Sequence, residues 1–95
     1  MATEPLREQP SELTYQTKDI HRAIASLNEE LEAVDLYNQR IDACKDEELK
    51  AILVHNRDEE KEHAAMLIEW FRRRDQQFAK ELKDHLFTDK TLGHH

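Results

Sequence analysis

The sequence contains very few residues that break helices. It has one glycine and two prolines among 95 residues, and the prolines, Pro5 and Pro10, both fall in the first ten positions. Between Ser11 and Leu92 there is neither glycine nor proline, so this stretch lacks the usual helix breakers. It is rich in Glu, Lys, Leu, Ala, Gln and Arg, which favour helix. We therefore predict an all-α protein with a single domain.

The scarcity of cysteine, of long apolar runs and of positive charge argues against several other classes of protein. Cys44 is the only cysteine, so the chain cannot form an internal disulfide, and we expect a cytoplasmic protein. The longest apolar run, Ala64–Ile68, is far shorter than the roughly 20 residues of a membrane span, and the first residues do not resemble a signal peptide. A net charge of −7 argues against nucleic acid, which requires a basic surface.

Apolar residues predict a first long helix from about Thr17 to Ala43. They are spaced 4, 3, 4, 3 and 7 positions apart, with Asn38 at the position the pattern skips. Such a heptad-like stripe packs lengthwise against a partner helix. The stripe consists of Ile20, Ile24, Leu27, Leu31, Val34 and Ile41.

The pattern restarts after a short turn around Cys44. Asp46 is a suitable N-cap for a second helix over residues 47–74, which ends in three arginines. Asp75 is a candidate cap for a short third helix that includes Phe78, Leu82 and Leu86. We expect an arm over residues 1–13, a helical unit over 14–88 and a tail over 89–95. The two long helices should form an antiparallel hairpin, with one apolar side left to dimerise into a four-helix bundle.

Three polar residues interrupt the apolar face of the second helix. At 100° per residue, Asn56, Glu60 and His63 fall in line with the surrounding apolar side chains. Burial of an unpaired carboxylate is costly, so such groups must be paired, neutralised or bound to metal. The apolar face consists of Leu49, Ile52, Leu53, Leu67, Trp70 and Phe71.

The first helix offers a partner for these groups. Glu30 lies at the edge of its apolar stripe, and an antiparallel hairpin brings it close to Glu60 and His63. Glu60 and His63 form a Glu-x-x-His pair, which shares one helical face. Di-iron bundles use one Glu from each of two helices and Glu-x-x-His from each of the other two. One chain supplies half of this set, so two copies would give four carboxylates and two imidazoles.

A Glu-x-x-His pair alone is weak support, because glutamate is abundant here. The competing interpretation is a buried hydrogen-bonded couple that fixes helix register in a metal-independent helical adaptor that dimerises. That interpretation accounts for one polar layer better than for three adjacent ones. A carboxylate–imidazole site that binds Zn²⁺ or Mn²⁺ also remains open. His55 and Glu59 fit a solvated flank, while His21 and His85 have no partner at metal-ligand spacing.

Two segments resemble the encapsulated ferritins, a family of bacterial and archaeal ferroxidases held inside encapsulin shells. They are Ser26–Asp35 (SLNEELEAVD) and His55–Met66 (HNRDEEKEHAAM), and the resemblance extends over residues 21–88. It implies a ferritin-like four-helix bundle made by a dimer, dimers assembled into a ring-shaped decamer, and a location inside an encapsulin nanocompartment. It also implies oxidation of Fe²⁺ to Fe³⁺ for iron storage in that shell.

The resemblance assigns roles to individual residues. Glu30, Glu60 and His63 match the iron ligands, and Tyr37 matches a position close to the iron centre. The other matches are Glu29 and Glu32, in an acidic patch through which metal enters, and His55, near an additional metal site.

The chain departs from the family pattern at two places. Leu36 precedes Tyr37 where the family usually has tryptophan, a change that removes no ligand. The final residues, 90–95, contain no convincing copy of the short shell-targeting peptide of the family, and we give the two terminal histidines no function.

Overall fold

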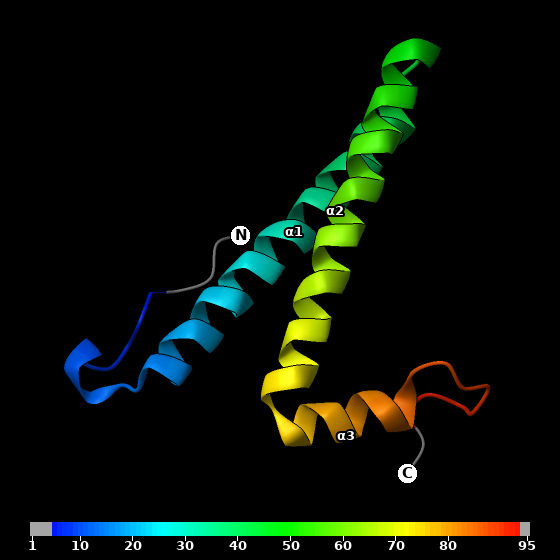
Figure 1. Ribbon diagram of the computed structural model, residues 1–95. Helices are drawn as coiled ribbons and strands as arrows, with labels where there is room; N and C mark the ends of the chain where they lie inside the picture. The colour runs from blue at the N-terminus through cyan, green and yellow to red at the C-terminus, as the bar shows by residue number, and fades with distance from the viewer. Residues whose placement is uncertain (1–4, 94–95) are drawn as a thin grey trace.

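The computed structural model describes residues 5–93, and helices are the regular secondary structure of this part of the chain, with no strand in it. A single turn of 3-10 helix, η1 (Pro10–Glu12), precedes the helices α1 (Tyr15–Ala43), α2 (Glu47–Arg74) and α3 (Gln76–His85). Helices α1 and α2 run antiparallel as a long hairpin, and α3 turns away from the open end of α2 (Figure 1). The expected all-α hairpin with a short third helix is confirmed. None of the described helices is long and apolar enough to span a membrane.

Side-chain caps determine where the long helices begin. The hydroxyl of Thr14 accepts a hydrogen bond from the Thr17 amide at 3.1 Å, so α1 begins two residues earlier than expected. The carboxylate of Asp46 accepts one from the Leu49 amide at 2.8 Å, and α2 has the predicted bounds. The last turn of α2 carries three arginines, whose positive charge suits the negative end of the helix dipole.

Asp75 ends α2 and begins α3. Its amide donates to the Phe71 carbonyl at 2.9 Å, and its carboxylate accepts from the Phe78 amide at 2.9 Å. The rings of Phe71 and Phe78 stack across the bend with centroids 5.6 Å apart. One polar residue and one ring pair therefore fix the angle of α3. Leu86, expected within the third helix, lies just after its last residue.

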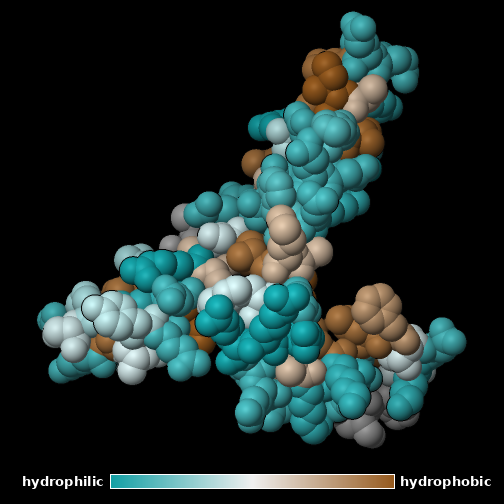
Figure 2. All heavy atoms as spheres, viewed as in Figure 1, coloured by the Kyte–Doolittle hydropathy of each residue, from teal (hydrophilic) through white to brown (hydrophobic). Residues whose placement is uncertain are grey.

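The isolated chain has a thin core. It measures 51 × 38 × 20 Å, and only Ala23, Ile41, Ala64 and Phe71 among the described apolar residues are buried. Several residues of the predicted stripes remain open to solvent, including Leu31 at 51% and Ile52 at 53% exposure. Apolar surface gathers at the tip of the hairpin and in the angle between α2 and α3 (Figure 2). Exposed apolar surface of this extent points to further association.

Some predictions concern residues that the structure does not describe. Residues 1–4 of the expected arm and both terminal histidines lie outside the described residues. Within the described part of the arm, η1 is the one helical turn, and it packs no buried residue. The division into arm, helical unit and tail, and the pairing of two chains into a bundle, remain predictions.

The double role of Asp75 gives the first prediction. Replacement by Ala removes the side-chain cap of α3, and we expect a loss of about 1 kcal/mol of unfolding free energy. Asp84→Ala is the matched control, because it removes only an exposed ion pair with Lys80 at 2.9 Å and should change stability by at most a few tenths of a kcal/mol. Urea unfolding of both variants followed by circular dichroism measures the difference. Equal stabilities would show that the cap does not hold α3.

Candidate metal centre

Glu30, Glu60 and His63 meet halfway along the hairpin. Nδ1 of His63 lies 3.3 Å from Oε2 of Glu30 on α1 and 3.8 Å from Oε2 of Glu60 on α2. One ligand atom from each of the three residues lies within 4.8 Å of the others. Within the described chain, this is the one group of three or more His, Cys, Asp or Glu residues that meets that spacing. The structure thus brings together the three residues predicted as ligands.

The geometry follows from helix periodicity. Glu60 and His63 are one turn apart on α2, so their side chains project from one face. Ala64, beside His63, is buried at 6% exposure, and the bond from His63 to Glu30 shows that this face of α2 is turned toward α1. Glu30 reaches the same point from the middle of α1 because the helices are antiparallel. The side chains remain 23% (Glu30), 25% (Glu60) and 40% (His63) exposed, so the cluster has an open side.

Crowding raises the proton affinity of the cluster. The hydrogen bond with Glu30 raises the pKa of Glu60 above its usual value, and partial desolvation and the negative charge of Glu30 add to this shift. Burial alone lowers the pKa of His63, but its hydrogen bond to Glu30 and the charges of Glu30, Glu60 and Glu62 outweigh burial and leave that pKa raised. The cluster therefore favours the protonated forms of Glu60 and His63 more than isolated side chains do.

The donor set fits a hard or borderline divalent cation. Carboxylate oxygens and imidazole nitrogen together suit iron, manganese and zinc. A cation would compete with protons for Glu60 and His63, because metal ligands bind in their deprotonated forms. Two carboxylates and one imidazole are, however, too few to complete a two-metal site of the type found in ferritin-like bundles.

The other candidates from the sequence lie outside this cluster. Tyr37 is half-buried on α1, and the guanidinium carbon of Arg40 lies 5.5 Å from the centre of its ring. Glu29 is exposed and Glu32 is half-buried. His55 is 72% exposed and pairs with Glu59 at 2.5 Å, which matches the solvated flank expected for both.

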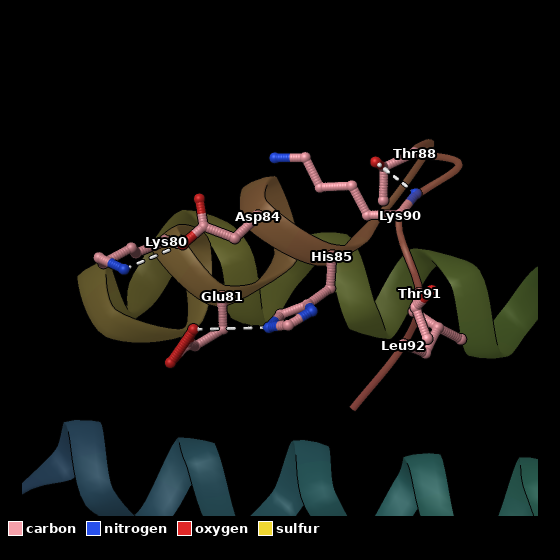
Figure 3. Close-up of a pocket in the computed structure, with 8 residues that line it drawn as sticks. All are labelled: Lys80, Glu81, Asp84, His85, Thr88, Lys90, Thr91 and Leu92. Carbon is pink, nitrogen blue, oxygen red and sulfur yellow. Dashed lines mark hydrogen bonds and ion pairs between the residues drawn. The ribbon is translucent and has the colours of Figure 1, made fainter. Parts of the chain in front are cut away.

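A second group of polar residues lines a pocket between α3 and the segment that follows it (Figure 3). His85 was expected to have no spaced partner, and this was wrong, because its Nε2 lies 4.0 Å from Oε1 of Glu81, one turn earlier. Lys80 Nζ binds the Asp84 carboxylate at 2.9 Å, so that carboxylate already has a cationic partner. The described pocket residues therefore offer no third ligand beside Glu81 and His85.

Arg57 was not among the residues predicted to connect the two helices. Its Nη1 donates to Oδ1 of Asn38 at 3.1 Å and so joins α2 to α1. The available signal was Asn38, the polar residue at the skipped position of the apolar stripe. The antiparallel alignment of the two helices could have predicted a charged partner for Asn38 at the facing position of α2.

Comparison with known proteins assigns the chain to a family. The model of the EncFtn-like family matches residues 5–89. The chain is 61% identical over 77 residues to an encapsulated ferritin-like protein of Rhodospirillum rubrum, with 81% of this chain and 55% of that protein covered. The chain therefore spans about half the length of that relative.

Two further relatives are also similar to this chain in sequence. A ferritin-like protein of Thermotoga maritima is 53% identical over 85 residues, covering 90% of this chain and 75% of that protein. An encapsulin nanocompartment cargo protein of Myxococcus xanthus is 44% identical over 59 residues, covering 62% of this chain and 45% of that protein.

A solved structure confirms the fold at high identity. The crystal structure of a Nitrosomonas europaea protein has a TM-score of 0.89 and 68% sequence identity, and the match covers 96% of this chain and all of that chain. The family model and the relatives support the resemblance found in the sequence. The chain belongs to the EncFtn-like family.

Proposed function

We propose that two copies of this chain form a di-iron ferroxidase that oxidises Fe²⁺ to Fe³⁺. The observation that carries the proposal is the meeting of Glu30, Glu60 and His63 within 4.8 Å at the middle of the hairpin, on an open side. Family membership indicates a role in iron handling associated with encapsulin. Iron is the substrate, and the cluster is its site of oxidation.

Charge and ligand counts favour a site shared by two chains. The cluster of one chain has two carboxylates and one imidazole, and a two-fold pair has twice that number. Four carboxylates balance the charge of two Fe²⁺ ions, and the resulting set matches the di-iron bundles. Exposed Leu49, Ile52 and Met66 on α2 supply apolar surface for such a pairing.

Each residue has a defined role in the proposed reaction. The carboxylates of Glu30 and Glu60 provide hard oxygen ligands, which stabilise Fe³⁺ more than Fe²⁺ and so favour oxidation. His63 supplies one nitrogen ligand per chain. Each Fe²⁺ loses one electron to an oxidant from solution. Tyr37 orients the ligands, and Glu29 and Glu32 attract cations toward the site, while His55 contributes to a further metal contact.

The larger assembly belongs to the same proposal. The family resemblance supports a ring-shaped decamer, in which the pairs that complete the site associate further. The names of two relatives, one an encapsulated protein and one an encapsulin cargo protein, support an encapsulin shell as partner and a location inside a cytoplasmic nanocompartment. Leu36, 42% exposed beside Tyr37, changes the surface near the site without removing a ligand.

The competing candidate is a metal-independent helical adaptor. The hydrogen bond between His63 and Glu30 favours it, because this bond satisfies polar groups without a metal. Under that candidate, the Glu60→Leu and His63→Leu variants gain thermal stability, since an apolar pair often replaces a buried ionic pair favourably.

The ligand assignment predicts a loss of activity. Glu60→Ala and His63→Ala should each lower the rate of aerobic Fe²⁺ oxidation by more than about 100-fold, because even groups behind metal ligands contribute 10–100-fold. Helix content should be retained. Absorbance of the ferric product measures the rate, and Lys61→Ala, an exposed change between the two ligands, is the control. Wild-type rates in both ligand variants would remove the cluster from the mechanism.

The shared site predicts that iron controls assembly. Added Fe²⁺ should shift the chain from monomer toward dimers or larger species under anaerobic conditions, because each metal links ligands of two chains. Native mass spectrometry with and without Fe²⁺ measures this shift and the number of metals per pair. The His63→Ala variant should not respond. A distribution that is unchanged by iron in the wild-type protein would favour the adaptor.

The raised pKa values predict a pH dependence. The pKa of His63 is raised, so its stabilisation of the folded chain is complete below the usual His pKa of about 6.5 and is lost as pH rises through the raised value. The contribution of Glu60, whose pKa is also raised, is complete only below its usual value of 4.5 and is lost as pH rises through its raised value. The Tm of metal-free protein should fall between pH 6 and pH 8.5, and should fall less in His63→Gln. Scanning calorimetry measures both. Parallel pH profiles for the two proteins would contradict the assignment.

A further inference from the structure

A polar residue occupies the apolar stripe of α1 at Asn38. The neighbouring stripe positions are Leu31, Val34 and Ile41, and Asn38 stands where the heptad spacing calls for an apolar residue. Its Oδ1 accepts a hydrogen bond from Nη1 of Arg57 on α2, at 3.1 Å. This bond spans 19 positions of sequence and crosses from one long helix to the other.

The donor in this pair is held in place. The Arg57 side chain is 23% exposed, the least exposed cationic side chain among the ion pairs described between residues 5 and 93. Its Nε also donates to Oδ1 of Asp58, at 3.2 Å. A guanidinium has donors in a rigid planar fork and no acceptor, so its partners must be oxygens in defined directions. The pair therefore restricts the position of Arg57 more than apolar contacts do.

The same helix alignment produces this pair and the metal cluster. Asn38 lies about two turns beyond Glu30 along α1, and Arg57 lies a little under two turns before His63 along α2. If α2 slipped by one residue, His63 would move by about 1.5 Å and its side chain would rotate by about 100° around the helix. Apolar stripes tolerate such slips because their contacts are not directional, whereas a directional polar pair between the helices favours one register. Asn38 is exposed and Arg57 is half-buried, so the pair lies at the edge of the helix contact.

The pair does not belong to the cluster. The Arg57 guanidinium bonds Asn38 and Asp58, and neither is one of the three clustered residues. On a helical wheel, Asn38 is about 80° from Glu30 and Arg57 about 120° from His63, so both point toward the other flank of the hairpin. An effect of this pair on the cluster must act through the relative position of the two helices.

We infer that Asn38 and Arg57 are positioning residues that set the register of α1 against α2 and so bring Glu30 to Glu60 and His63. The effect on iron oxidation rests on the proposed function, but the effect on register does not. Asn38→Leu restores the apolar stripe and removes the acceptor, whereas Asn38→Asp keeps an oxygen acceptor for Arg57. Gln39→Leu is the matched control, because Gln39 bonds only its own helix, through Asp35 at 3.3 Å.

Register is measured first, in metal-free protein. Spin labels at Asp42→Cys and Glu62→Cys, both exposed positions, report the distance between the helices in a Cys44→Ser background, with labelled chains diluted in unlabelled protein. Asn38→Leu should shift the main distance by about 1.5 Å or more, or divide it into several populations. Asn38→Asp and Gln39→Leu should retain the wild-type distance. A wild-type distance in Asn38→Leu would overturn the inference.

Activity is measured second. Asn38→Leu should lower kcat/KM for aerobic Fe²⁺ oxidation at least tenfold while its Tm is unchanged or higher, because a misplacement of about 1 Å can reduce rates strongly. Asn38→Asp should restore the wild-type value, which a purely structural role of the stripe does not predict. If Asn38→Leu does not fold, Arg57→Met is measured with the same expectations. If the wild-type protein does not oxidise iron, the proposed function fails, and the label distances still decide the role of the pair.

Discussion

The organisation of this protein depends on a layer of ionisable groups within the contact between two antiparallel helices. Nδ1 of His63 lies 3.3 Å from Oε2 of Glu30 and 3.8 Å from Oε2 of Glu60, and all three side chains are only partly exposed to water. The hydrogen bond with Glu30, partial desolvation and the negative charge of Glu30 raise the pKa of Glu60, so negative charge at this layer is unfavourable. Within one chain, protonation of Glu60 or His63 relieves this unfavourable charge. A divalent cation offsets this negative charge more completely, which connects the electrostatics of the hairpin to its proposed chemistry.

The scarcity of buried apolar residues also favours the pairing of two chains. The described core contains two alanines, one isoleucine and one phenylalanine, and much of the apolar stripe is open to solvent. Short chains bury a limited part of their surface, so association is an effective way for them to gain stability. The open apolar surface and the open side of the cluster both belong to the hairpin, and pairing of two chains would cover both.

Local signals in the sequence predicted local structure well. The bounds of α2 followed from Asp46 and the terminal arginines, because caps and charges near helix ends act within one turn. The start of α1 was misplaced by two residues, since the hydroxyl of Thr14 was not recognised as a cap. The contact between His85 and Glu81 was also missed, although both residues lie on one helix at a common spacing.

The sequence by itself determined that the chain is helical, that two helices form a hairpin, and that Glu30, Glu60 and His63 are the candidate metal ligands. These conclusions depend on periodicity and capping, which arise from interactions between residues a few positions apart. Only the tertiary structure decided that ligand atoms of the three side chains lie within 4.8 Å of one another, and that Arg57 bonds Asn38. Those distances depend on the register of two helices, and register is set by contacts between residues far apart in the sequence.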